Sequence, residues 1–297
     1  MIGTKQPIQM KKLLLILTGL TFSWALLAQD QGRKAAVVEP SANEHAITLQ
    51  HPWTGKKVLF IGDSISDSRD TNPGKHYYDH LSEWLGLTAY VPAISGLEMS
   101  HVAMQVEIFR NTAPGLQPDM ICIFLGTNDY NNGVPIGEWY QETAGEVEAA
   151  VGEPKKFFHR MHRTFLYDPE TFKGRINMAV KFLREAFPGT PITFFTPIHR
   201  AYFDCGNDNV QPEETWPNSI GLYLDSYVQA IQEAANVWSV NVIDLHSVAG
   251  LFPLLPGEAE VFFGDNPKDR LHPRYAGHKR LAEVIMYQSL LLPCRGH

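Results

Sequence analysis

Five short apolar segments alternate with longer amphipathic segments along this chain, and that alternation restricts its fold more than any other feature. The apolar segments are rich in β-branched and aromatic residues and span 56–62, 88–94, 119–126, 191–197 and 240–245. Strands that lack polar alternation are usually buried on both faces of a sheet. The pattern therefore predicts an α/β fold in which helices cover both faces of a five-stranded parallel sheet.

The segments between these strands have the periodicity of amphipathic helices. Apolar residues recur every three to four positions over 99–106, 176–186 and 224–238, and a last helix is predicted from about 277 to 291. Of the 297 residues, 44% are hydrophobic and 19% are charged. This composition is typical of one large globular domain or two small ones and not of a disordered chain.

The N-terminus has the form of an export signal. Two lysines precede an apolar stretch, 13–28, that closes on alanine, which is typical of a cleaved signal peptide. Because this stretch is shorter than the roughly 20 residues that span a bilayer, no stable membrane anchor is expected after cleavage. We therefore predict a signal peptide at 1–28, a polar linker at 29–54 and a domain at 55–297, in a protein that is periplasmic or secreted.

Charge and cysteine content exclude several classes of protein. The formal net charge of −7 is spread along the chain, which gives no sign of nucleic-acid binding. The three cysteines, Cys122, Cys205 and Cys294, have no CxxC spacing, so neither a metal site nor a redox motif is predicted. Cys122 lies in an apolar segment and is expected to be a buried thiol. The sequence does not decide whether Cys205 and Cys294 form a disulfide.

The first apolar segment ends in the sequence FIGDSIS, residues 60–66, where a glycine, an acid and two serines follow. In open parallel sheets, ligands bind beyond the carboxyl ends of the strands. Ser64 follows the strand at that edge, and the glycine before it allows a sharp turn that exposes the hydroxyl, as a nucleophile requires. Gly-Asp-Ser is also common in ordinary turns and helix caps, so this segment alone does not identify an active site.

Three further segments carry groups that a serine nucleophile needs. Asn128, in FLGTND after the third strand, has an amide that can donate to an oxyanion, and Gly96, in AISGLEMS after the second strand, has a backbone N–H that can do the same. In DRLHPRYAGH, Asp269 precedes His272 by three residues. At that spacing the carboxylate can accept the Nδ1–H of the imidazole, so that Nε2 serves as the base for Ser64.

Together these segments resemble the sequence blocks of the SGNH or GDSL hydrolases, a family of serine esterases and lipases. The resemblance covers about residues 56–290 and rests on GDSIS, ISG, GTND and DRLHP. Isoleucine replaces the leucine of the nominal GDSL motif, and the second block lacks the asparagine often found before its glycine. The resemblance implies a flavodoxin-like three-layer α/β/α sandwich and an enzyme that needs neither a metal ion nor another cofactor.

The mechanism that the resemblance implies is a double displacement at an ester carbonyl. Ser64 attacks, His272 takes and returns the proton, and Asp269 orients the imidazole. The backbone N–H groups of Ser64 and Gly96 and the amide of Asn128 form the oxyanion hole. Acids that adjoin these blocks, Asp63 and Asp129, are expected to fix the loops through hydrogen bonds.

Residues 130–174 form a long insertion before the fourth strand, and this insertion is rich in aromatic residues. Such a segment either walls the site, with Trp139 and Tyr167 as candidate substrate contacts, or packs its aromatic residues into a side core. His199 and Arg200 follow the fourth strand at the same edge and are further candidate contacts with the substrate. The sequence does not decide between a wall and a side core.

Two functions of other classes fit the sequence less well than a serine esterase does. A metallophosphoesterase needs several carboxylates and histidines that converge on two metal ions, and its GDxxD and GNHD/E blocks are missing from the sequence. A non-catalytic carbohydrate-binding protein does not need Ser64, Asp269 and His272 together. Because aromatic residues with polar neighbours favour a glycan ester, a carbohydrate O-acetylesterase is expected ahead of a lipase, a lysophospholipase or an acyltransferase of the same family.

Overall fold

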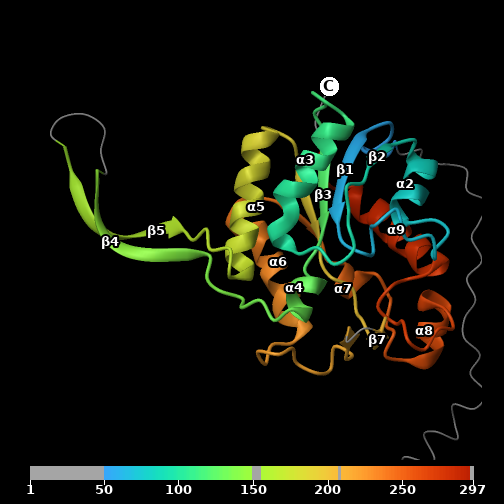
Figure 1. Cartoon of the computed structure of the whole chain (residues 1–297). Coiled ribbons are helices and arrows are strands. Elements are labelled where there is room, and N and C mark those ends of the chain that lie inside the picture. Colours follow the sequence, from blue (N-terminus) through green and yellow to red (C-terminus); the bar gives the residue numbers. More distant parts are fainter. Residues whose placement is uncertain (1–49, 149–154, 207–208, 295–297) are drawn as a thin grey trace, which may run out of the picture. The chain divides into compact units, whose positions relative to one another are not determined.

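Five parallel strands form the central sheet of the computed structural model, which describes residues 50–148, 155–206 and 209–294 (Figure 1). The predicted signal peptide and the predicted linker up to residue 49 lie outside the described residues. The strands lie in the order β2-β1-β3-β6-β9 and are β1 (Lys57–Gly62), β2 (Thr88–Tyr90), β3 (Met120–Phe124), β6 (Ile192–Phe195) and β9 (Asn241–Ile243). This is the doubly wound order of flavodoxin-like folds, so the predicted fold class is confirmed.

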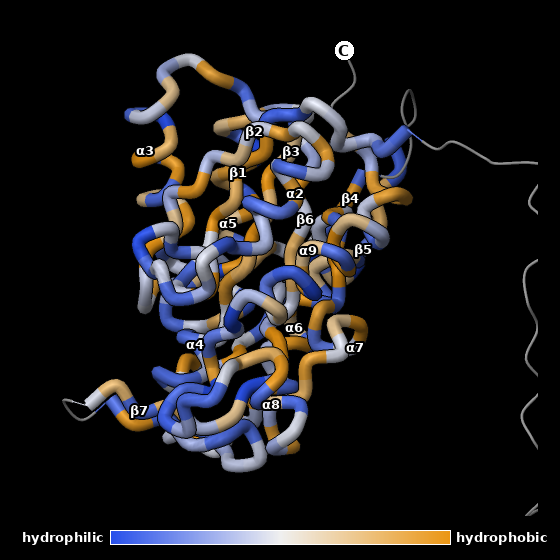
Figure 2. Tube along the Cα trace, turned by 90° about the vertical axis from the view of Figure 1, so that its right-hand side faces the viewer, coloured by the Kyte–Doolittle hydropathy of each residue, from blue (hydrophilic) through white to orange (hydrophobic). Residues whose placement is uncertain are grey.

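Both faces of the sheet are apolar. In β1, Leu59 and Ile61 are buried in the core on one face, whereas Val58 and Phe60 are buried in the core on the other. Parallel pairing places Val58 beside Met120 of β3, so the same division continues across the sheet. Hydrophobic residues accordingly follow the central strands in Figure 2. Burial on both faces is the physical reason that these strands show no polar alternation in the sequence.

Helices cover each face of the sheet. One face packs against α3 (Val102–Thr112), α5 (Phe172–Ala186) and α6 (Leu224–Trp238), and the 3-10 helix η1 (Met99–His101) leads into α3. The other packs against α2 (Tyr77–Leu85), α7 (Leu245–Val248), α8 (Pro256–Phe263) and α9 (Tyr275–Ser289). A further short helix, α4 (Thr127–Asn131), begins just after β3. None of the helices in the described part of the chain is both long and apolar enough to cross a membrane.

Two antiparallel ribbons lie outside the main sheet, and the sequence pattern predicts neither. Within the insertion, β4 (Tyr140–Glu148) pairs with β5 (Phe157–Phe165) along its whole length. This ribbon projects outward beyond α5 (Figure 1). The second ribbon is short and pairs β7 (Phe203–Asp204) with β8 (Val210–Gln211) near the carboxyl ends of the central strands.

All three cysteines are free thiols. Cys122 is buried in β3, as the sequence predicts. Cys205 follows β7 at the carboxyl edge of the sheet, whereas Cys294 lies near Lys56 and Asp119, the residues just before β1 and β3, at the amino edge. Because the two cysteines lie at opposite edges, the disulfide that the sequence leaves open does not form.

Candidate active site

Ser64 lies in the turn that follows β1, close to the point where the strand order reverses between β1 and β3. Gly62 ends β1, and a Cβ atom on it would lie 2.5 Å from the hydroxyl oxygen of Ser66. Gln105 of α3 holds the turn in place, because its side chain accepts from the Gly62 N–H at 3.0 Å and donates to the Gly62 carbonyl at 2.9 Å. Sheets of this topology bind their ligands at such a reversal.

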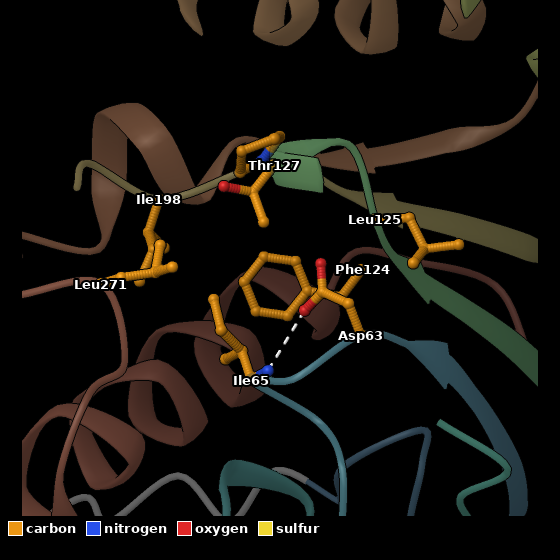
Figure 3. Close-up of a pocket in the computed structure, with 8 residues that line it drawn as sticks. Asp63, Ile65, Phe124, Leu125, Thr127, Ile198 and Leu271 are labelled. Atoms are coloured by element: carbon orange, nitrogen blue, oxygen red, sulfur yellow. Dashed lines mark hydrogen bonds between the residues drawn. The ribbon is translucent and has the colours of Figure 1, made fainter. Parts of the chain in front are cut away.

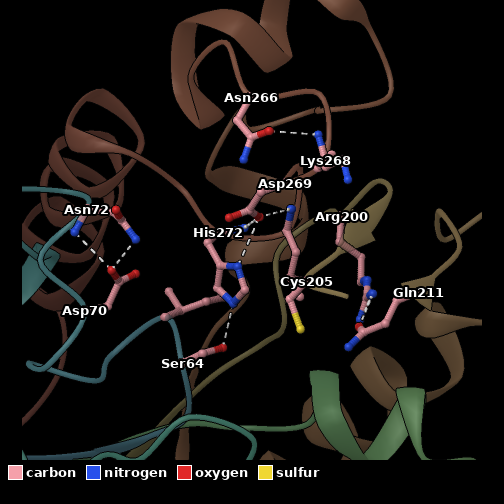
Figure 4. A network of polar contacts seen from close by, with 12 residues as sticks. Ser64, Asp70, Asn72, Arg200, Cys205, Gln211, Asn266, Lys268, Asp269 and His272 are labelled. Carbon is pink, nitrogen blue, oxygen red and sulfur yellow. Dashed lines mark hydrogen bonds and ion pairs between the residues drawn. The ribbon is translucent and has the colours of Figure 1, made fainter. Parts of the chain in front are cut away.

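Ser64, His272 and Asp269 form a continuous chain of hydrogen bonds (Figure 4). Nε2 of His272 lies 2.9 Å from Oγ of Ser64, and Nδ1 lies 3.0 Å from Oδ1 of Asp269. That carboxylate oxygen also accepts the backbone N–H groups of Leu271 and His272, which stiffens the loop before α9. When Nδ1–H donates to the carboxylate, Nε2 is left as an acceptor that can remove the serine proton.

Asp269 is stabilised in its ionised form. Burial by itself raises the pKa of this carboxyl, but hydrogen bonds from the His272 side chain and from the backbone bring its pKa below the ordinary value. Nη2 of Arg274 lies 3.3 Å from the second carboxylate oxygen. The carboxylate can therefore stabilise the imidazolium that forms when His272 accepts a proton.

The ribbon of β7 and β8 supports the loop of residues 268–272, which carries this acid and base. The backbone amides of Ala201 and Asp204 donate to carbonyl groups of the loop at 3.0 and 2.7 Å. The ring of Phe203 packs edge-on against the imidazole of His272, with 4.9 Å between ring centroids. Sequence reasoning missed Phe203, because the pairing of β7 with a loop some 65 positions away has no local signature.

Gly96 lies in the loop after β2, and Asn128 lies in the first turn of α4, just after β3. The strands β2 and β3 flank β1. Gly96 is exposed and has a φ of +82°, a conformation that glycine adopts without steric cost. The side-chain amide of Asn128 donates to the carbonyl of Leu97 at 3.0 Å, which ties α4 to the loop after β2. This edge of the sheet therefore combines a backbone N–H with a side-chain amide, the kinds of donor that hold an oxyanion.

Two buried carboxyl groups fix these loops, as the sequence predicts. Asp129 accepts the N–H of Met99 at 2.9 Å and an Nη1–H of Arg175 at 2.8 Å. Asp63 accepts the N–H of Ile65 at 3.1 Å beside a mainly apolar cavity of about 10 Å³ (Figure 3). Because burial disfavours the charged form, the pKa of Asp63 rises to about 7 and that of Asp129 to about 6.

Trp139 belongs to the core and not to the wall of the site. Its side chain is 7% exposed, its Nε1 donates to Glu233 of α6 at 2.8 Å, and Nζ of Lys173 lies over its ring. The interpretation of Trp139 as a substrate contact is therefore wrong, because its ring and its N–H are both occupied within the protein. For this residue the side-core interpretation of the insertion is correct.

Tyr167 is exposed, but it lies along the outside of α5. Its ring packs near Phe165 of β5, and Nζ of Lys181 lies 6.0 Å from the ring centroid. Lys181 belongs to the third turn of α5, whereas Arg175, in the first turn, is the residue that reaches Asp129 at the site. This placement argues against Tyr167 as part of a wall around Ser64.

Arg200 and His199 lie in the segment after β6. Arg200 is buried and donates to Thr127 and to Gln211, and burial lowers its pKa to about 10. The interpretation of Arg200 as a substrate contact is wrong, because its Nη groups serve the protein interior. Nδ1 of His199 lies 2.5 Å from a carboxylate oxygen of Glu214, and a quarter of the His199 side chain is exposed. A role for His199 toward substrate stays a prediction.

Comparison with known proteins places this site in a family. Residues 60–280 match the family model described as the GDSL-like lipase/acylhydrolase family. No curated protein sequence matches the chain significantly. Among the described residues, no group of three or more His, Cys, Asp or Glu side chains is arranged to hold a metal ion.

Several solved structures share the fold. A protein from Lactobacillus plantarum is 23% identical, with a TM-score of 0.59 over 79% of this chain and 96% of its own. A possible lipase from Chitinophaga pinensis is 18% identical, with a TM-score of 0.56 over 78% and 97%. A member of the lipolytic protein G-D-S-L family from Veillonella parvula is 12% identical, with a TM-score of 0.50 over 78% and 96%. The chain belongs to the GDSL-like lipase/acylhydrolase family and is a carboxylic ester hydrolase.

Proposed function

We propose that the protein is a serine esterase that works through a covalent acyl-enzyme at Ser64. The observation that carries this proposal is the unbroken hydrogen-bonded chain from Asp269 through His272 to Ser64, with contacts of 3.0 and 2.9 Å. In the first step, Ser64 attacks the ester carbonyl while His272 takes its proton and passes it to the leaving alcohol. Water then attacks the acyl-enzyme with the same groups in the same roles, which releases the acid and restores Ser64.

The negative charge that develops on the carbonyl oxygen is assigned to three donors. These are the backbone N–H groups of Ser64 and Gly96 and the side-chain amide of Asn128. In the free enzyme, the Asn128 amide donates to the Leu97 carbonyl at 3.0 Å. On reaction it would exchange this neutral acceptor for the oxyanion, a stronger partner for a hydrogen-bond donor.

For the substrate, we propose an acetylated carbohydrate outside the cytoplasm. A hollow of about 240 Å³ beside His199 includes Glu214, Tyr223 and Asp225 in its lining. Side chains of these kinds hydrogen-bond to hydroxyl groups and stack on sugar rings. The extracytoplasmic location rests on the N-terminal sequence pattern alone.

The test combines a variant with a substrate series. We expect Ser64→Ala to lower kcat/KM for p-nitrophenyl acetate by about 10⁴-fold or more, whereas the control Ser68→Ala, an exposed serine four residues on, keeps full activity. On the wild type, kcat/KM should fall from the acetyl to the octanoyl ester and be higher for an acetylated oligosaccharide than for either. Near-normal turnover by Ser64→Ala would contradict the mechanism, and a preference for the octanoyl ester would replace the glycan with a lipid.

A further inference from the structure

The ribbon of β4 and β5 is an exposed element that no described segment of the chain covers. In its two nine-residue strands, every residue except Tyr140, Gly145 and Phe165 is exposed. Figure 1 shows the ribbon standing apart from the α/β body, on the side of α5 and away from β7 and α8. Isolated two-stranded ribbons are marginally stable in water. Contact with another molecule would remove this weakness.

The base of the ribbon is firmly held, so the exposed part is presented in a fixed direction. Phe165 stacks on Trp238 of α6 with 4.2 Å between ring centroids. Asn177 of α5 donates to the carbonyl groups of Trp139 and Leu166, which flank the ribbon, at 3.0 and 2.8 Å. These contacts connect the ribbon to the same core that buries Trp139.

Beyond the base, the ribbon exposes large apolar side chains. The exposed fractions are 61% for Met161, 52% for Phe157, 50% for Val147 and 41% for Phe158. Apolar groups that are concentrated on a projecting element are typical of an interaction surface. The ribbon register divides them between the two faces: Met161, paired with the small Ala144, and Phe157 lie on one face, and Val147 and Phe158 are paired on the other.

The two strands of the ribbon carry side chains of opposite charge. The strand β4 carries three glutamates and no basic residue, whereas residues 155–165 carry four basic residues, two histidines and no acid. The register pairs Glu142 with Arg163 and Glu146 with His159, on the same face as Ala144 and Met161. On this face, β4 therefore forms an acidic column (Glu142 and Glu146) and β5 a basic column (His159 and Arg163). The pair of Ala144 and Met161 lies between the two charged pairs.

We propose that this face of the β4–β5 ribbon is a dimerisation arm whose partner is the same face of a second copy of this chain. Pairing of the ribbons edge to edge about a two-fold axis would set β4 against β4 or β5 against β5, with like charges in contact. Stacking face to face about a two-fold axis that runs along the ribbon sets β4 of each copy over β5 of the other. Glu142 then faces Arg163 of the second copy, and Met161 packs over the small Ala144.

The experiment measures mass in solution and uses charge reversal. Wild type is expected to have twice the monomer mass by light scattering. The double variant Arg163→Glu with His159→Glu makes both columns acidic, and Glu142→Lys with Glu146→Lys makes both columns basic. Each variant alone should dissociate, with the dimer dissociation constant raised about tenfold or more, and an equimolar mixture of the two should regain the dimer mass.

Matched controls separate this arm from other causes. Arg160→Glu reverses a charge on the opposite face of the ribbon and should leave the dimer intact. Met161→Ser keeps every charge and should weaken the dimer, which tests the surface without charge repulsion inside the ribbon. All variants should hydrolyse p-nitrophenyl acetate at the wild-type rate, which would show that the α/β body is folded.

Several outcomes would overturn the proposal. One is a monomeric wild type at up to about 100 µM. Another is a dimer that survives both double variants, and a third is a mixture that stays monomeric. A monomer that sediments with vesicles of phosphatidylcholine and phosphatidylglycerol would replace the second copy with a membrane surface.

Discussion

The turn that carries Ser64 and the ribbon of β4 and β5 are both exposed to a ligand or partner, but they are held in place in opposite ways. At the turn, groups from α3, from α4 and from the loop before α9 converge on a few residues through hydrogen bonds. In the described part of the chain, the contacts that hold the ribbon are at its base, with α5 and α6. A substitution at the turn should therefore change the chemistry, and one on the ribbon should change association and leave the chemistry alone.

After Ser64→Ala, the largest expected effect comes from Asp269→Asn. Asn keeps the size of the side chain but loses the charge that stabilises the imidazolium, and its amide can favour the wrong tautomer of His272. We expect kcat/KM for p-nitrophenyl acetate to fall by about 10³- to 10⁴-fold, with little change in thermal unfolding. Asp265→Asn, an exposed residue of the same segment, is the control and should keep wild-type activity.

A charge reversal on the ribbon should, in contrast, leave catalysis unaffected. Arg163→Glu should leave kcat/KM unchanged, because Arg163 reaches Glu142 across the ribbon and not the active site. A large loss of activity in Arg163→Glu would show that the two regions are coupled and would break the comparison.

A smaller effect is expected where the ribbon meets the body. Trp139→Ala removes a buried ring and leaves Glu233 without its indole partner. The free energy of unfolding in urea should fall by about 3–5 kcal/mol, whereas Met161→Ala on the exposed ribbon should change the monomer's stability by about 0.5 kcal/mol or less. A raised KM for an acetylated glycan in Trp139→Ala, at unchanged stability, would instead restore the wall interpretation.

The helices and strands that could be predicted from sequence are those whose hydrophobic pattern is explained by burial alone. Ile176, Val180 and Leu183 recur at helical spacing because α5 buries a single stripe, and β3 is uniformly apolar because both of its faces are covered. The predicted strand at 88–94 was too long. Only Thr88–Tyr90 is paired, because β2 is an edge strand with one neighbour and Pro92 follows it.

For the candidate site, the sequence places three of the four motif segments after strands, and parallel topology brings these three to one edge of the sheet. The fourth segment, with Asp269 and His272, lies between α8 and α9 and not at a strand end. The sequence cannot place Arg200, because its partners Thr127 and Gln211 lie in segments with no shared pattern. It cannot separate Trp139 from the ribbon either. Aromatic residues occur both in cores and on interaction surfaces, and only the packing decides between the two.

The smallest expected effect is the pH dependence of stability, and it concerns the body alone. His278 of α9 is buried, and its Nδ1 accepts the backbone N–H of Tyr77 in α2 at 3.2 Å. Burial lowers the pKa of His278 well below its ordinary value of 6.5, and the positive charges that His76, His80, His272 and Arg274 can carry act in the same direction. The unfolded chain therefore binds this proton more readily than the folded protein. The contribution of His278 to stability is complete above pH 6.5 and is lost as the pH falls below that value.

The variant His278→Asn isolates this contribution, because its amide oxygen can still accept the Tyr77 N–H. Between about pH 7 and pH 5, the wild type should lose up to about 1.4 kcal/mol of unfolding free energy per pH unit more than the variant does. Asp63 has a pKa of about 7 in the folded protein, so its contribution to stability is lost as the pH rises, opposite to that of His278. Because wild type and variant both contain Asp63, its contribution cancels when their stabilities are compared. Urea titrations across this range provide the measurement, with His162→Asn on the exposed ribbon as a control that should follow the wild type. Parallel stability curves for wild type and His278→Asn would show that α2 and α9 accommodate a charged His278, and that acid sensitivity does not distinguish the body from the ribbon.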